Sequence, residues 1–144
     1  CQHYDARIDA HDTEGTSARG YRAEDESFEF YAELDRSCSW WSPRKASVPV
    51  EYVLEHEQIH FALFELPARR ANRKPPPLHA TAKTDQEPER QIATKIEHAL
   101  ASVMRAAVDE NRRFDEETSL GYKPDAQKRW NARVERELET YGVR

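Results

Sequence analysis

The pentapeptide His56-Glu57-Gln58-Ile59-His60 combines residue types that can perform metal-assisted hydrolysis. Residues four apart lie on one face of a helix, so the imidazoles of His56 and His60 can reach the same metal ion. The carboxylate of Glu57 then lies beside the metal, where it can take a proton from a bound water. This H-E-x-x-H spacing is typical of zinc hydrolases. The alternative is a surface helix on which residues 55–57 form a solvated, charged face.

Composition limits what kind of protein carries this motif. The length of 144 residues suits one domain, spanning residues 1–144. Hydrophobic residues make up 38% and charged residues 34%, so the core is modest and depends on the aromatic side chains. The net charge of −5 argues against non-specific binding to nucleic acid. No apolar run approaches the length of a transmembrane helix.

The two cysteines leave the compartment open. Cys1 and Cys38 can pair, which would suit an oxidising environment, and neither belongs to a C-x-x-C pair that would bind zinc. Cys1 stands first in the chain, which would also suit the lipid-bearing residue of a processed lipoprotein. The simpler interpretation is that it is an ordinary residue at the start of the chain.

The first third of the chain predicts strands. Apolar and polar residues alternate over residues 6–10 and again over residues 28–34, with a glycine-containing loop between them. These two segments are expected to form an antiparallel pair with one face on a core. The fold class predicted for the whole chain is therefore α+β, with a small N-terminal antiparallel sheet followed by three helices.

The first of these helices is expected to begin near Ser47–Pro49 and to carry the motif, as in zincins. Pro67 cannot donate a hydrogen bond to the carbonyl of Leu63, so a kink or an early stop is expected there. A loop then extends from the basic residues after Pro67 through the three consecutive prolines at 75–77 to about Glu87.

The two later helices are predicted from apolar spacing. The second is expected over about residues 89–112, with a stripe made by Ile92, Ile96, Leu100, Val103, Met104, Ala107 and Val108. The segment Phe114–Lys123 is expected to be a polar turn. The third helix has Pro124 in its first turn and continues to about Tyr141, with Trp130 packing it against the motif helix.

Beyond the motif itself, the chain resembles a bacterial family of unknown function described as predicted secreted zinc-dependent (HExxH) proteases. The similarity lies in residues 54–61, the preceding Ser39-Trp40, the block Phe114–Thr118, and Gly121, Gln127 and Trp130 that follow it. It covers roughly residues 28–141, in the same order and at similar spacing. Two departures stand out: Leu120 replaces a histidine that often precedes the glycine, and Pro67 replaces a helix-forming residue.

The resemblance implies a third metal ligand in the block after the second helix. A catalytic zinc takes three protein ligands and keeps one position open. Asp115 is the preferred third ligand and Glu117 its rival, although either carboxylate could instead lie in a turn or cap the next helix. His79 and His98 are further candidates. If the family histidine is a ligand or a catalytic donor, Leu120 leaves this chain without it.

The resulting hypothesis is a secreted or periplasmic zinc metallopeptidase of the bacterial cell envelope. Zn²⁺ would activate a water, Glu57 would act as general base, and a peptide or protein would be the substrate. The alternative is a catalytically degenerate envelope protein that binds a metal or a partner, which the absence of the histidine at Leu120 favours. Another divalent metal is a weaker alternative, because histidine–carboxylate sites accept several.

Overall fold

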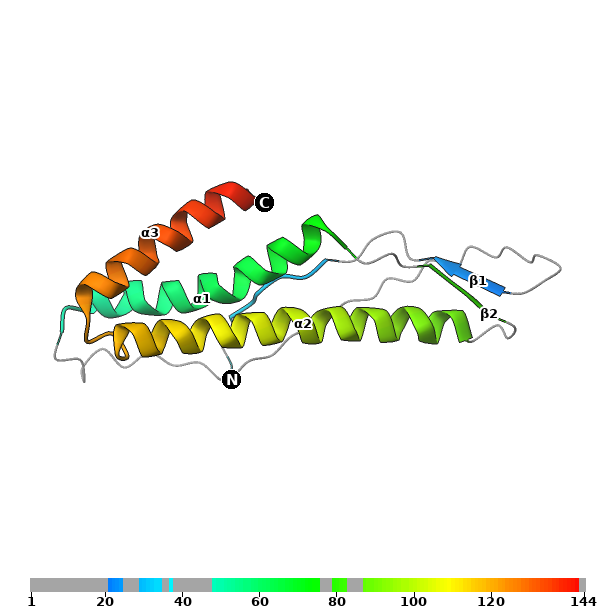
Figure 1. The fold of residues 1–144 in the computed structure, drawn as a ribbon, viewed down its shortest axis with the longest axis horizontal. Helices are drawn as coiled ribbons and strands as arrows, with labels where there is room; N and C mark the ends of the chain where they lie inside the picture. Colours follow the sequence, from blue (N-terminus) through cyan, green and yellow to red (C-terminus); the bar gives the residue numbers. More distant parts are fainter. Residues whose placement is uncertain are drawn as a thin grey trace.

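The computed structural model describes residues 21–24, 29–34, 37, 48–75, 79–82 and 87–142. Three helices dominate these residues: α1 (Val50–Arg73), α2 (Glu87–Thr118) and α3 (Pro124–Tyr141). Two four-residue strands, β1 (Tyr21–Glu24) and β2 (His79–Ala82), pair antiparallel beside the N-terminal half of α2. Helices α1 and α2 run antiparallel and side by side, and α3 packs against α1 (Figure 1).

The predicted α+β class with an N-terminal sheet is wrong for the described chain, which is an assembly of three helices. The short pairing of β1 with β2 is not that sheet, because β2 comes from the connection between α1 and α2. Residues 29–34 form no strand, although their alternation predicted one. The other predicted strand, residues 6–10, lies outside the described residues.

The alternation in residues 29–34 has a different physical origin. The backbone N–H of Phe30 donates to Oδ1 of Asn72 at 2.8 Å, and the N–H of Ala32 donates to Oε2 of Glu65 at 3.0 Å. Polar side chains of α1 thus satisfy the backbone groups that a neighbouring strand would otherwise bind. Phe30 is buried. The pattern therefore marks a segment that lies on a helix with one side toward the core.

Helix α1 continues through Pro67 to Arg73, so the expected early stop is wrong. Leu66, Pro67 and Ala68 are all buried. Burial of this turn offsets the hydrogen bond that Pro67 cannot make. Arg69 lies on the next turn, and its Nε donates to Oε1 of Glu65 at 2.7 Å.

Helix α2 extends six residues beyond the predicted end at residue 112. The expected polar turn is thereby reduced to residues 119–123, and Phe114 and Asp115 become helical. The chain reverses through three consecutive residues with positive φ, namely Ser119 (51°), Leu120 (56°) and Gly121 (85°). Helix α3 then starts at Pro124, as predicted.

The main core lies where the three helices meet. Ile59 and Leu63 of α1 pack with Phe114 of α2 and with Trp130 and Val134 of α3. Trp130 therefore joins α3 to the motif helix, as predicted. None of the described helices combines the length and apolar character that a membrane-spanning segment needs, which agrees with the sequence.

Four charged side chains link the three helices to one another. Arg70 contacts Glu110 at 2.9 Å and also Glu137, while Arg133 contacts Glu110 at 3.1 Å and Glu137 at 2.7 Å. Desolvation by burial raises the pKa of the Glu137 carboxyl, but the hydrogen bonds from Arg133 and Arg70 outweigh it and hold that pKa below the usual value. The network therefore favours the charged form of Glu137.

Candidate metal centre

Two nitrogen atoms from α1 and one oxygen atom from α2 converge between these helices, near the C-terminal end of α2. The Nε2 atoms of His56 and His60 lie 3.2 Å apart, and Oδ1 of Asp115 lies 3.6 Å from the first and 3.2 Å from the second. Because α1 and α2 are antiparallel neighbours, one turn of each helix is enough to supply all three groups. The three residues form the one cluster of potential metal ligands found among the described residues.

The size of this triangle fits a tetrahedral zinc ion. Zinc lies about 2.0–2.2 Å from nitrogen and oxygen ligands, and tetrahedral angles then place two ligand atoms about 3.3 Å apart. The three separations in the cluster, 3.2, 3.2 and 3.6 Å, bracket that value. Two imidazole nitrogens and one carboxylate oxygen are also a typical donor set for a zinc hydrolase.

A buried amide determines which nitrogen of His56 carries the proton. Nδ1 of His56 lies 2.9 Å from Oε1 of Gln127, whose side chain is fully buried. The Nε2 group of Gln127 donates to the carbonyl of Tyr52 at 3.1 Å and to Glu55 at 3.0 Å, which fixes the orientation of the amide. An amide oxygen can only accept, so Nδ1 of His56 is the donor, and in the neutral imidazole Nε2 then keeps its lone pair.

The same arrangement recurs at His60. Its Nδ1 lies 2.6 Å from Oδ1 of Asn111, and the Nδ2 group of Asn111 donates to the carbonyl of Ala107 at 2.8 Å. The amide is again oriented by a backbone carbonyl, so Nδ1 of His60 donates, and in the neutral imidazole Nε2 has a free lone pair. Metal-binding histidines usually have such a partner on their second nitrogen, which orients the ring and raises its basicity.

These tautomers give the cluster its chemical character. When both imidazoles are neutral and carry their proton on Nδ1, three hydrogen-bond acceptors face one another at 3.2–3.6 Å without a donor among them. Such a group is stabilised by a cation at its centre. Phe114, fully buried, contacts both rings, with centroids 4.6 Å from His56 and 4.9 Å from His60. It holds the rings in place.

The turn after α2 closes the cluster on the side of His56. A β-carbon on Gly121 would lie 3.4 Å from Nδ1 of His56, and φ of Gly121 is 85°. Both the close approach and the positive φ favour glycine. The phenol of Tyr52 donates to the carbonyl of Gly121 at 2.7 Å. Burial, with a smaller effect from the charge of Glu55, raises the pKa of Tyr52, so the phenol stays protonated and continues to donate.

Glu57 is exposed and makes no hydrogen bond or ion pair with any other described residue. It lies three residues before His60 on α1, which places it about 60° around the helix from that histidine. A general base needs an ionised carboxylate beside the metal that is not already engaged in an ion pair. Glu57 is exposed on the side of α1 next to His60.

The rival ligands lie elsewhere. Oε2 of Glu117 accepts the indole N–H of Trp130 at 2.8 Å, because positions 115 and 117 are about 200° apart on α2. His98 is exposed and lies seventeen residues before Asp115, about 25 Å along the helix. His79 belongs to β2, where the neighbouring Ala80 packs near Ile92 at the opposite end of α2.

Sequence reasoning did not find Asn111, and it assigned no role to Gln127. A signal for Asn111 is present, since it precedes Asp115 by four residues and must share its face if α2 continues that far. The signal was missed because the helix was expected to end at residue 112. No spacing rule connects Gln127 to His56, which are 71 residues apart.

Comparison with known proteins adds no relative. No family model, no curated protein and no solved structure matches the chain. The resemblance to the predicted secreted zinc-dependent proteases therefore stays a prediction from the motifs quoted above.

Proposed function

We propose that this protein is a zinc-dependent hydrolase of the peptidase class, with His56, His60 and Asp115 as metal ligands and Glu57 as general base. One observation carries the proposal. Three acceptor atoms converge at the spacing of tetrahedral zinc ligands, and both histidines donate their remaining N–H to buried amide oxygens. A polar helix face with no ligand has no need for this arrangement.

The chain's own groups have separate roles in this mechanism. His56 and His60 would hold the zinc through Nε2 and Asp115 would hold it through a carboxylate oxygen, while the two amides keep the imidazoles in the tautomer that this requires. Bound zinc would supply a Lewis acid and a water of near-neutral pKa. The Glu57 carboxylate accepts the proton from the attacking water and then delivers it to the leaving amine.

The number of ligands favours a catalytic over a structural site. Structural zinc sites are closed by four protein ligands, whereas catalytic sites have three and one open position. The described residues contribute three: two histidines and one aspartate. Because Asp115 has a side chain 35% exposed, the centre is also open to solvent on its side.

The second candidate is a catalytically degenerate protein that binds a metal or a partner. It is favoured by Leu120, which occupies the position where the resembling family often has a histidine. Under this alternative the zinc site is retained but hydrolysis is lost. The secreted or periplasmic location and the possible lipid anchor at Cys1 stay predictions, and both Cys1 and Cys38 lie outside the described residues.

Metal content and hydrolysis of unstructured casein, measured on the same preparations, test the proposal. We expect one equivalent of zinc in the wild type and none in the double variant His56→Ala, His60→Ala. Glu57→Gln should keep its zinc and lose hydrolysis, while Glu51→Gln, an exposed glutamate on the same helix, should keep both. Zinc without hydrolysis in the wild type would favour the degenerate protein. No zinc in any variant, even after zinc is supplied, would overturn the proposal.

A further inference from the structure

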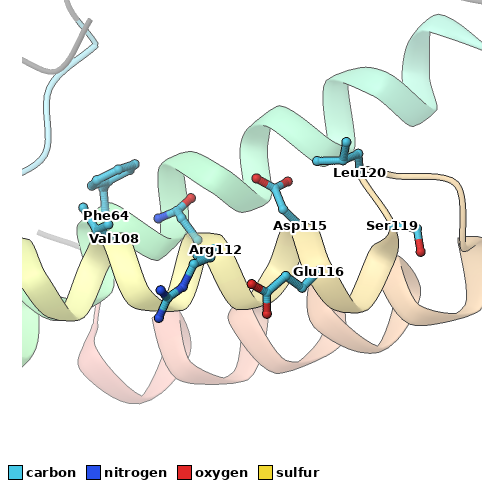
Figure 2. A pocket seen from close by; sticks show the side chains of 8 residues that line it. Phe64, Val108, Arg112, Asp115, Glu116, Ser119 and Leu120 are labelled. Atoms are coloured by element: carbon cyan, nitrogen blue, oxygen red, sulfur yellow. The ribbon is translucent and has the colours of Figure 1, made fainter.

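An open groove of about 550 Å³ runs beside the metal centre, between α1 and α2. Asn111 and Asp115 line it and also belong to the centre, so the groove and the candidate metal site are continuous. The remaining lining residues are Phe64, Val108, Arg112, Glu116, Ser119 and Leu120. Figure 2 shows Asp115 directed toward α1 between the two ends of the groove.

The two ends of this groove are apolar. Phe64 and Val108 lie together at one end, and Leu120 lies at the other (Figure 2). Val108 is 46% exposed and Leu120 is 69% exposed, so the protein's own core does not use them. Val108 was expected on the buried stripe of α2 and instead faces this groove. Exposed apolar side chains that line a groove beside a reactive centre are typical of ligand sites.

Helix geometry places Glu57 on the same side as the groove. Glu57 and Phe64 are seven residues apart on α1, which leaves them about 20° apart around the helix axis. Phe64 lines the groove, and Phe61, between them on this face, is 43% exposed. A molecule lying in the groove would therefore pass the carboxylate of Glu57 and the metal ligand Asp115.

The conformation of Leu120 supports a role outside the core. Its φ of 56° lies in the left-handed region, which is unfavourable for an L-residue with a bulky side chain. Hydrogen bonds hold it there: its N–H donates to the carbonyl of Asp115 at 2.8 Å, and the N–H of Lys123 donates to the carbonyl of Thr118 at 2.9 Å. The turn thus presents an apolar side chain at the groove's end without gaining stability from its burial.

The polar residues of the rim carry opposite charges. Arg112 donates to Asp109 at 3.1 Å, and Glu116 lines the groove one turn further along α2. Apart from Asp115, which is a proposed metal ligand, Arg112 and Glu116 are the charged lining residues; their charges offset each other, so the rim provides little preference for an acidic or a basic side chain. Selectivity is left to the apolar ends.

We propose that this groove is the substrate subsite of the enzyme and binds an extended peptide, with an apolar side chain seated between Phe64 and Val108. The inference rests on the proposed function, because it names the substrate class of the same site. Val108 lies on α2, and Ser119 lies eleven residues later, just beyond the end of that helix. The helical rise over eleven residues is about 16 Å, which is the length of about five residues of extended peptide. Leu120 contacts the other end of that peptide.

Peptide binding to the zinc-loaded Glu57→Gln variant tests the inference without turnover. The probes are the pentapeptides Ala-Ala-Leu-Ala-Ala, Ala-Ala-Ala-Ala-Ala and Ala-Ala-Asp-Ala-Ala, titrated by amide-resolved NMR, which detects weak binding. We expect the leucine peptide to bind about tenfold more tightly than the other two and to shift the amides of Val108 and Leu120.

Two substitutions then locate the apolar contact. Val108→Glu should remove the preference for leucine, whereas Ala106→Glu should keep it, because Ala106 is exposed on the same helix about 160° away. Both add the same charge at an exposed position, so folding should be retained. Leu120→Asn keeps the turn and should also weaken binding.

The outcomes separate this inference from the proposed function. Equal binding of the three peptides, no binding of any at millimolar concentration, or equal effects of Val108→Glu and Ala106→Glu would overturn the subsite, even with zinc and hydrolysis established. Leucine-selective binding at Val108 would support the subsite even if the wild type hydrolysed nothing. A wild type that hydrolysed nothing would count against the proposed hydrolase function.

Discussion

Oε1 of Gln127 lies 2.9 Å from Nδ1 of His56 and joins α3 to the proposed metal centre on α1. Gln127 is fully buried, and its amide is oriented by Tyr52 and Glu55. Gln127 of α3 therefore decides the tautomer of His56, a proposed metal ligand on α1. The orientation of His56 in the proposed metal centre therefore depends on how α3 packs against α1, and not on the motif alone.

Replacing Gln127 with methionine, which is of similar size, should weaken zinc binding about ten- to a hundredfold, because the N–H of His56 loses its acceptor. Stability should also fall by about 1–3 kcal/mol, since buried polar groups lose a partner. Competition with a chromophoric chelator measures the first effect and urea unfolding the second. Asn131→Ala, on the exposed side of α3, is the control. Unchanged zinc affinity in Gln127→Met would show that the amide does not support the ligand.

Asn111 allows a test with a conservative rescue. Asn111→Ala should lower zinc affinity about tenfold or more, because Nδ1 of His60 loses its acceptor. Asn111→Asp restores an oxygen acceptor and should recover most of the affinity. The same chelator competition reports both values. If alanine and aspartate lower the affinity equally, the contact with His60 is not the cause.

The two carboxylates proposed as third ligand can be compared directly. Asp115→Asn should lower zinc affinity at least a hundredfold, since the charge and the anionic ligand oxygen are lost. Glu117→Gln should keep zinc, because its carboxylate contacts Trp130 and not the histidines. Zinc titration of the two variants under the same conditions is the measurement. The reverse order of affinities would move the site to Glu117.

The acid dependence of stability should include a contribution from Glu137. Its pKa is lowered in the folded protein from the ordinary value near 4.5, so its stabilising effect is fully present above that value and is lost as pH falls through the lower folded pKa. Urea unfolding between about pH 7 and about pH 3 should show a weaker loss in that window for Glu137→Gln than for wild type. Glu135→Gln, an exposed carboxylate of α3, should behave as wild type. Identical slopes for all three proteins would contradict the prediction.

Leu120→Asn should not destabilise the protein. Asparagine adopts the left-handed conformation more readily than leucine, and the leucine side chain is 69% exposed, so little burial is lost. A thermal midpoint equal to wild type or a few degrees higher is expected. Tyr122→Asn, in the same turn but without a positive φ, should show no gain. A clear drop in the midpoint of Leu120→Asn would mean that its side chain packs in the core.

Local features of the chain were predicted where local rules are sufficient. The helical spacing of residues 56 and 60 and the start of α3 at Pro124 both follow from rules that act within one or two helical turns. The predicted sheet failed because alternation in residues 29–34 indicates an extended segment with one buried side, and a helix can bury that side as well as a sheet can. The end of α2 was misplaced because polarity after residue 112 was interpreted as a turn.

The sequence by itself therefore determined which residues could hold a metal on one helix face, since a helix has a fixed period. Only the tertiary structure decided which carboxylate joins them. Asp115 and Glu117 are two residues apart and chemically alike, but the packing of α2 against α1 turns the first toward the histidines and the second toward Trp130. The tautomers of His56 and His60 depend on Gln127 of α3 and Asn111 of α2. Such contacts depend on how helices pack, which spacing along one chain does not encode.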